Sequence, residues 1–128
     1  MPPNQRAMTP ISTPAEALAY QMAVIALYLD LPETPLRASA SDQLQARYWF
    51  QHGVPFAIVQ TALWLGSLRR LLRPADALPL SAIRSLAYFQ PVVQELLQAP
   101  VPDGYRVHLQ RKIQPYLRAQ PGAQDSGR

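Results

Sequence analysis

Cysteine is absent from this chain of 128 residues, so neither a disulfide framework nor a thiolate metal site is available. The apolar stretches are all shorter than the ~20 residues that cross a bilayer. The N-terminus also lacks a basic region followed by an apolar run, which is what an export signal requires. We therefore predict a cytoplasmic protein with no membrane partner.

Signatures of catalysis are missing as well. The two histidines, His52 and His108, lie far apart and outside any metal-ligand spacing, and the eight acidic residues are scattered singly. None of the five glycines belongs to a phosphate-binding loop. We therefore predict that the protein is not an enzyme, with no catalytic residue, metal, cofactor or small-molecule substrate.

The net charge of +4 is unevenly distributed. Residues 1–36 carry one arginine against three acids, whereas residues 37–118 carry ten basic residues against four acids. Eleven of the twelve basic residues are arginine, which makes planar, bidentate contacts with phosphate or carboxylate. Nucleic acid and an acidic protein surface both fit this charge, and so does a solvated cationic surface.

The hydrophobic pattern predicts an all-α protein, a compact bundle of about five helices in a single domain over residues 13–118. Residues 1–12 are predicted to be a flexible segment and residues 119–128 a disordered tail. The first helix should begin at Thr13 with Pro14 and a capping box to Glu16, and run to about Leu31. Almost its whole circumference is apolar or small, so it should be buried on several sides, in its own core or against another copy.

Capping residues and prolines delimit three further segments. A second helix should begin near a cap at Ser41, with Asp42 at its positive end, and end at a left-handed Gly53. A third, the centre of the fold, should span Pro55 to Leu72, with Gly66 as a point of close packing. The connector over residues 32–40 holds two prolines and cannot continue the first helix.

The remaining helices are predicted after a loop from Pro74 to Pro79. Ser81 should cap a bent helix from about Leu80 to Gln98, with the bend at Pro91. A last helix should run from Tyr105 to about Arg118, unless Pro115 ends it earlier.

The step from the second to the third helix through His52-Gly53-Val54 has the spacing of a helix-turn-helix. The positions that would face a DNA groove offer few hydrogen-bonding side chains: Phe56, Ala57, Gln60, Thr61 and Trp64. We therefore favour two packed helices as the interpretation of this helix-turn-helix-like central pair.

One set of residues covers about a third of the chain: Gly53-Val54-Pro55 with Val59, then Arg69-Arg70, then Ile83-Arg84-Ser85-Leu86-Ala87-Tyr88-Phe89 with Pro91-Val92. This set resembles a helical module of bacterial replication-initiator, primosome-type and other mobile-element proteins. The resemblance implies an accessory role in a DNA-processing or mobile-element system, without catalysis.

Two functions follow as hypotheses. In the first, an arginine-rich surface contacts the nucleic-acid backbone, and the sequence leaves open whether its basic residues form one patch. Its residues would be Arg69, Arg70, Arg73, Arg84, Arg106, Arg111 and Lys112. In the second, the protein is an interaction or dimerisation module without nucleic-acid contact, and docks on a protein partner or on its own copy. The partner-binding candidates are Met22, Ile25, Tyr48, Trp49 and Trp64.

Overall fold

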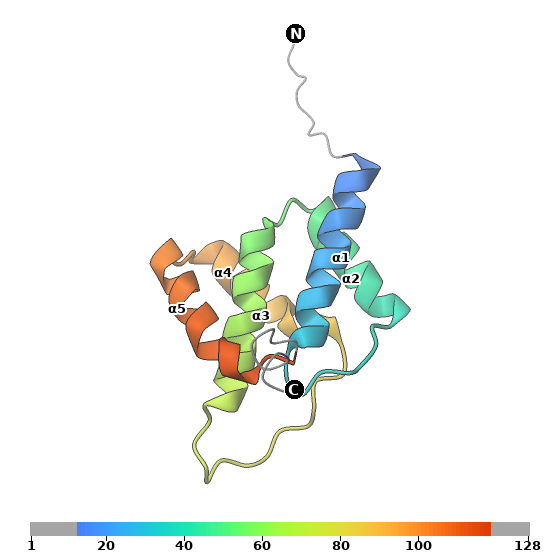
Figure 1. The fold of residues 1–128 in the computed structure, drawn as a ribbon. Helices are drawn as coiled ribbons and strands as arrows, with labels where there is room; N and C mark the ends of the chain where they lie inside the picture. Colours follow the sequence, from blue (N-terminus) through green and yellow to red (C-terminus); the bar gives the residue numbers. More distant parts are fainter. Residues whose placement is uncertain (1–12, 119–128) are drawn as a thin grey trace, which may run out of the picture.

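Five α-helices surround a core centred on α3 in the computed structural model, which describes residues 13–118 (Figure 1). Their bounds are α1 Pro14–Asp30, α2 Ala40–Gln51, α3 Phe56–Leu71, α4 Gln90–Gln98 and α5 Asp103–Ile113, with 3-10 helices η2 Leu86–Phe89 and η3 Gln114–Tyr116. No strand occurs within this described range, so the all-α prediction is confirmed. The predictions for residues 1–12 and 119–128 lie outside the described residues.

The start of α1 is as predicted. The Glu16 backbone N–H donates to the Thr13 hydroxyl, and the Thr13 N–H donates to the Glu16 carboxylate, both at 3.0 Å. These bonds satisfy two backbone donors that the first turn of a helix leaves without intrahelical partners. Because every part of this signal lies within four residues, the sequence alone was enough to place it.

The cap of α2 corrects the prediction at Ser41. Ser39 is the N-cap residue, and its hydroxyl accepts the Asp42 N–H while the Asp42 carboxylate accepts the Ser39 N–H. The second carboxylate oxygen of Asp42 accepts the buried N–H of Leu86 at 2.9 Å, far along the chain. Asp42 therefore ties the start of α2 to the start of η2. At the other end of α2, Gly53 has the predicted left-handed conformation, with φ of 70°.

α3 is the central helix, as predicted. Pro55 precedes it as the N-cap residue rather than being its first helical residue. Every residue from Thr61 to Leu68 is buried, because α1, α4, α5 and η2 all pack against this helix. Gly66 is the predicted point of close approach, since a Cβ atom there would lie 2.8 Å from the ring of Phe89.

The segment before α4 differs from the predicted bent helix over Leu80–Gln98. Residues 80–85 are extended, and Ser81 caps no helix; a regular α-helix begins only at Gln90. The extended backbone is held by contacts with distant residues, because the N–H of Ile83 donates to the Glu33 carbonyl at 3.0 Å and that of Leu86 donates to Asp42. These bonds replace those that a helix would have supplied internally.

α5 begins at Asp103, two residues before the predicted start, and ends at Ile113. Pro115, the earlier of the two predicted stops, lies within η3. Arg118 follows, and its guanidinium donates to the carbonyls of Leu29 in α1 and Thr34 in the connector after it. These hydrogen bonds hold the end of the described chain against the end of α1.

Tyr28 provides a test of this core at alkaline pH. Its ring is fully buried against Phe89, and its hydroxyl has no hydrogen-bond partner among the described residues. Burial and, to a smaller extent, the charge of Asp42 raise the pKa of Tyr28. The folded state therefore keeps this proton at a pH at which the unfolded chain, with a tyrosine pKa of about 10, releases it, so stability falls as the pH rises above that value.

We expect Tyr28→Phe to have the same free energy of unfolding as the wild type at about pH 9. Between about pH 9 and about pH 11, its free energy of unfolding should fall by about 1.4 kcal/mol less than that of the wild type. Urea unfolding at the two pH values measures this. Tyr20→Phe serves as the comparison, because burial also raises the pKa of Tyr20 but its hydroxyl donates to the Val54 carbonyl at 2.8 Å. Tyr20→Phe should therefore lower stability already at pH 9. Equal pH dependence of wild type and Tyr28→Phe would contradict the prediction.

Candidate functional site

The predicted basic residues lie on two sides of α3. Arg69 and Arg70 are adjacent in sequence, so their side chains leave the helix about 100° apart. Arg69 forms a bidentate ion pair with Glu95 of α4, at 2.8 and 2.7 Å, and these hydrogen bonds hold the pKa of Glu95 below its usual value. About half of each side chain remains exposed, so solvent screens this pair.

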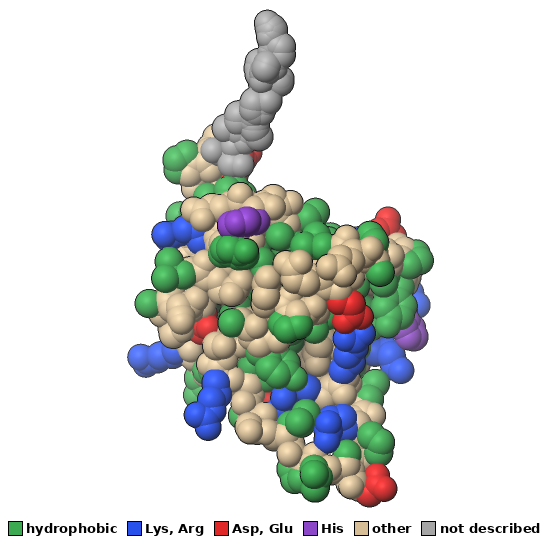
Figure 2. All heavy atoms as spheres, turned by 180° about the vertical axis from the view of Figure 1, so that it is seen from behind, with side chains coloured by type: hydrophobic (Ala, Val, Ile, Leu, Met, Phe, Trp, Pro, Cys, Tyr) green, Lys and Arg blue, Asp and Glu red, His purple; other side chains and the backbone are tan. Residues whose placement is uncertain are grey.

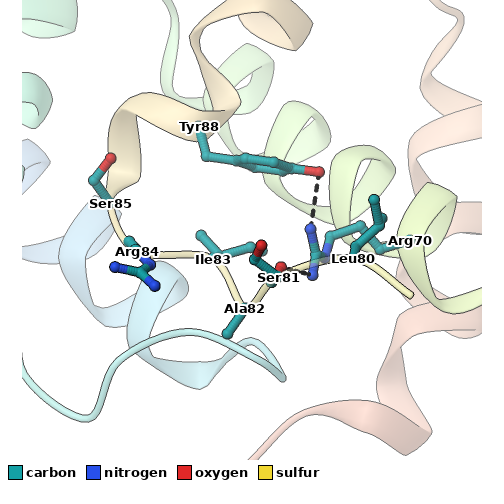
Figure 3. A pocket seen from close by; sticks show the side chains of 8 residues that line it. All are labelled: Arg70, Leu80, Ser81, Ala82, Ile83, Arg84, Ser85 and Tyr88. Carbon is teal, nitrogen blue, oxygen red and sulfur yellow. Dashed lines mark hydrogen bonds between the residues drawn. The ribbon is translucent and has the colours of Figure 1, made fainter. Parts of the chain in front are cut away.

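Arg70 lies on the other side, where it lines one end of a pocket of about 420 Å³ (Figure 3). Its side chain is only 6% exposed and donates to the carboxylate of Glu33, the hydroxyl of Tyr88 and the carbonyl of Ser81. Figure 3 shows Arg84 at the far end of this pocket, pointing away from Arg70. Arg70 therefore joins α3 to the extended segment and to the connector after α1, and most of its donors are already used.

The other predicted basic residues lie on other parts of the surface and have other contacts. Arg73 donates to the Leu78 carbonyl within its own loop. Along α5, Arg106 turns toward Gln60 at 3.3 Å, Lys112 lines a groove against α3, and Arg111 is exposed. The seven predicted residues therefore do not form one patch. In Figure 2, Lys and Arg side chains occur as separate groups, with hydrophobic and uncharged polar surface between them.

Two of the predicted partner-binding residues belong to the core, which corrects that prediction. Trp49 is fully buried and its indole N–H donates to the Gln90 side chain, and Trp64 is also buried. Their size predicted a role in binding, but both side chains are part of the hydrophobic core. Thr61 is buried too, so the start of α3 presents an incomplete surface to a DNA groove.

The exposed candidates lie on the outside of the α1–α2 pair. Met22 and Tyr48 are 62% and 43% exposed, and Ile25 is partly buried against the core. Two further apolar residues, which the sequence analysis missed, lie beside them: Leu18, 55% exposed, and Leu44, 60% exposed. We refer to Leu18, Met22, Leu44 and Tyr48 as the apolar face.

Helix geometry places these four residues on one surface. Met22 is about 200° around α1 from the buried Val24, and Leu18 lies one turn before Met22 on the same side of α1. Leu44 and Tyr48 are each about 200° around α2 from the buried Ala46. The two helices pack side by side, with a hydrogen bond between the side chains of Gln21 and Gln43. The spacing of Leu44 and Tyr48, opposite the buried row of α2, is the sequence signal that could have identified them.

A second apolar surface is the α3–α5 groove, of about 280 Å³. Its floor consists of Leu65 and Leu68 from α3, the C-cap residue Leu72 that follows α3, and Leu109 from α5, and Arg69 and Lys112 lie at its rim. Both cations were predicted to contact nucleic acid, and the apolar floor between them was not predicted from the sequence.

Comparison with known proteins assigns no function to these surfaces. No protein-family model, curated protein or solved structure matches this chain. Among residues 13–118, no helix is both long enough and apolar enough to cross a membrane, and no three His, Cys, Asp or Glu side chains lie close enough to hold a metal ion.

Proposed function

We propose that this protein is a non-enzymatic helical interaction module that pairs with a second copy of itself through the apolar face. One observation carries the proposal: four large apolar side chains lie 43–62% exposed on the outward surface of two packed helices. Single exposed apolar residues are ordinary on protein surfaces, whereas a group of this kind is typical of interaction sites.

The composition of α1 supports the same conclusion. Residues 17–29 contain no charged side chain, although only one side of this helix packs against the core. A surface helix normally carries charged residues on its outer side, and a helix that is apolar all round is normally buried. Association of the apolar face with another protein surface would bury the remaining side of α1.

A second copy is the partner that this face fits best. The four side chains of this face are uncharged and offer no charge complementarity to an acidic or basic protein, but an apolar face can match itself across a two-fold axis. Met22 is the middle residue of α1, so an antiparallel pairing of two α1 helices would place the two Met22 side chains at the axis. Each Leu18 would then face the second half of the other α1.

The test is the mass of the protein in solution, measured by light scattering over a range of concentrations. We expect a dimer for the wild type, and at least tenfold weaker pairing for Met22→Asp, because the substitution brings two carboxylates together at the axis. Leu44→Asp should also weaken pairing. The matched control is Leu36→Asp, since Leu36 is 82% exposed on the connector and away from the apolar face. Helix content by circular dichroism identifies any variant that fails to fold.

A wild-type protein that stays monomeric at about 1 mM, or a Leu36→Asp variant that dissociates as readily as Met22→Asp, would overturn the proposal. The hypothesis of a nucleic-acid-binding accessory protein, and with it the resemblance to replication-initiator modules, stays a prediction with less support from this geometry. Its residues face in several directions, and Arg69 and Arg70 are engaged by Glu95 and Glu33. A measured affinity for DNA that falls steeply with salt concentration would instead favour the nucleic-acid hypothesis.

A further inference from the structure

The α3–α5 groove combines an apolar floor with a cationic rim. Leu65, Leu68 and Leu109 are buried parts of the core, whereas Leu72 at the end of α3 is 54% exposed. Leu65, Leu68 and Leu72 follow the i, i+3, i+7 spacing of a single helix face. The floor is therefore built mostly on buried core residues and is exposed to solvent at Leu72.

The charge at the rim is positive and only partly balanced. Arg69 is held in place by Glu95, but Lys112 pairs with no carboxylate among the described residues. His108 and Tyr105, whose rings stack with centroids 6.1 Å apart, line the α5 side. A ligand lying along the floor would thus meet an available cation at Lys112 and hydrogen-bonding groups beside it.

We propose that this groove binds a short, acidic, amphipathic helical segment of a partner protein. Its volume is below that of pockets that enclose drug-sized ligands, so it accommodates one or two apolar side chains from a larger partner. A helix presents such side chains at i, i+3 or i+4, and i+7, which matches the direction of a groove between two helices. A carboxylate on the same segment pairs with Lys112, and a second one approaches the exposed part of Arg69.

Charge is what distinguishes this partner from a second copy of the chain. The apolar face is uncharged, whereas the groove carries cations and fits an acidic ligand. The groove also lies on the α3–α5 side of the bundle, and the apolar face lies on the α1–α2 pair (Figure 1). The two surfaces can therefore be occupied at once, which would make a dimer of this protein a carrier of two acidic segments.

The experiment uses a labelled helical peptide with leucines at i, i+4 and i+7 and glutamates at the flanking positions. A matched peptide has glutamine in place of every glutamate. We expect the full-length protein to bind the acidic peptide at least tenfold more tightly than the glutamine peptide in fluorescence anisotropy, with the difference shrinking as salt is added.

Variants of adjacent residues locate the site. Lys112→Glu should weaken binding of the acidic peptide at least tenfold, and Leu72→Ser should also weaken it. Arg111→Glu makes the same change of charge on the neighbouring residue, which does not line the groove, and should retain most of the affinity. Met22→Asp should bind the peptide normally, which separates failure of this inference from failure of the dimer.

Several outcomes would overturn the inference. One is the absence of binding at about 1 mM acidic peptide. Another is an equal loss for Lys112→Glu and Arg111→Glu, which would indicate attraction by the overall charge rather than docking in the groove. A third is a short duplex DNA that binds more tightly than the acidic peptide and depends on Lys112, which would make nucleic acid the ligand of this surface.

Discussion

Asp42→Ala is expected to lower the free energy of unfolding by about 3 kcal/mol, the largest effect that we predict for a single substitution. The Asp42 carboxylate is buried and accepts hydrogen bonds from the backbone N–H groups of Ser39 and Leu86. Removing it breaks the half of the capping box that the Asp42 side chain supplies to the Ser39 N–H, and it leaves the Leu86 donor buried without a partner. Because domains of this size are stable by about 5–15 kcal/mol, such a loss is a substantial fraction of the total.

Urea unfolding of three variants separates the causes. Asp42→Asn keeps a carbonyl oxygen that can accept the Leu86 N–H but removes the charge and one acceptor, so we expect about half the loss. Asp76→Ala removes an exposed carboxylate from the loop after α3 and should change stability by no more than about 0.5 kcal/mol. If Asp42→Ala cost no more than Asp76→Ala, the proposed link between α2 and η2 would be wrong.

This residue also shows where sequence analysis succeeds and where it stops. The Thr13-x-x-Glu16 box was predicted because both partners are local, and Ser39-x-x-Asp42 has a similar local spacing that was assigned instead to Ser41. The bond from Asp42 to Leu86 spans 44 residues, and no local pattern encodes it. That bond, with the one from Ile83 to Glu33, keeps residues 80–85 extended despite their helical hydrophobic spacing.

The candidate site shows the same difference between features that the sequence predicts and features that depend on how the helices pack. The sequence predicted a first helix that is buried on several sides, in its own core or against another copy, and within this chain Met22 and Leu18 of α1 are exposed. Arg69 and Arg70 were treated as one cluster, because neighbours in sequence look close, although the helix turns them to different partners. Trp49 and Trp64 could not be placed without knowing which helices meet, since a large aromatic side chain suits a core and an interface equally well.

Gly66→Ala should lower stability by about 1–3 kcal/mol, even though alanine is favoured over glycine by about 1 kcal/mol in a helix interior. The added Cβ would lie 2.8 and 2.9 Å from two carbon atoms of the Phe89 ring. That ring is fully buried between the rings of Tyr28 and Tyr88, with edge contacts to both, so it cannot turn away without disturbing them. The steric cost therefore exceeds the gain in helix propensity.

Gly104→Ala is the matched control, because Gly104 lies in α5 and an added Cβ there would meet nothing within 4 Å. The same substitution should therefore leave stability unchanged or raise it by up to about 1 kcal/mol. Thermal or urea unfolding of both variants measures the difference in sign. Combining Gly66→Ala with Phe89→Leu should cost less than the sum of the two single changes, because the smaller side chain makes room for the methyl group. Additive losses, or equal effects at Gly66 and Gly104, would show that α3 and η2 do not approach as closely as this contact requires.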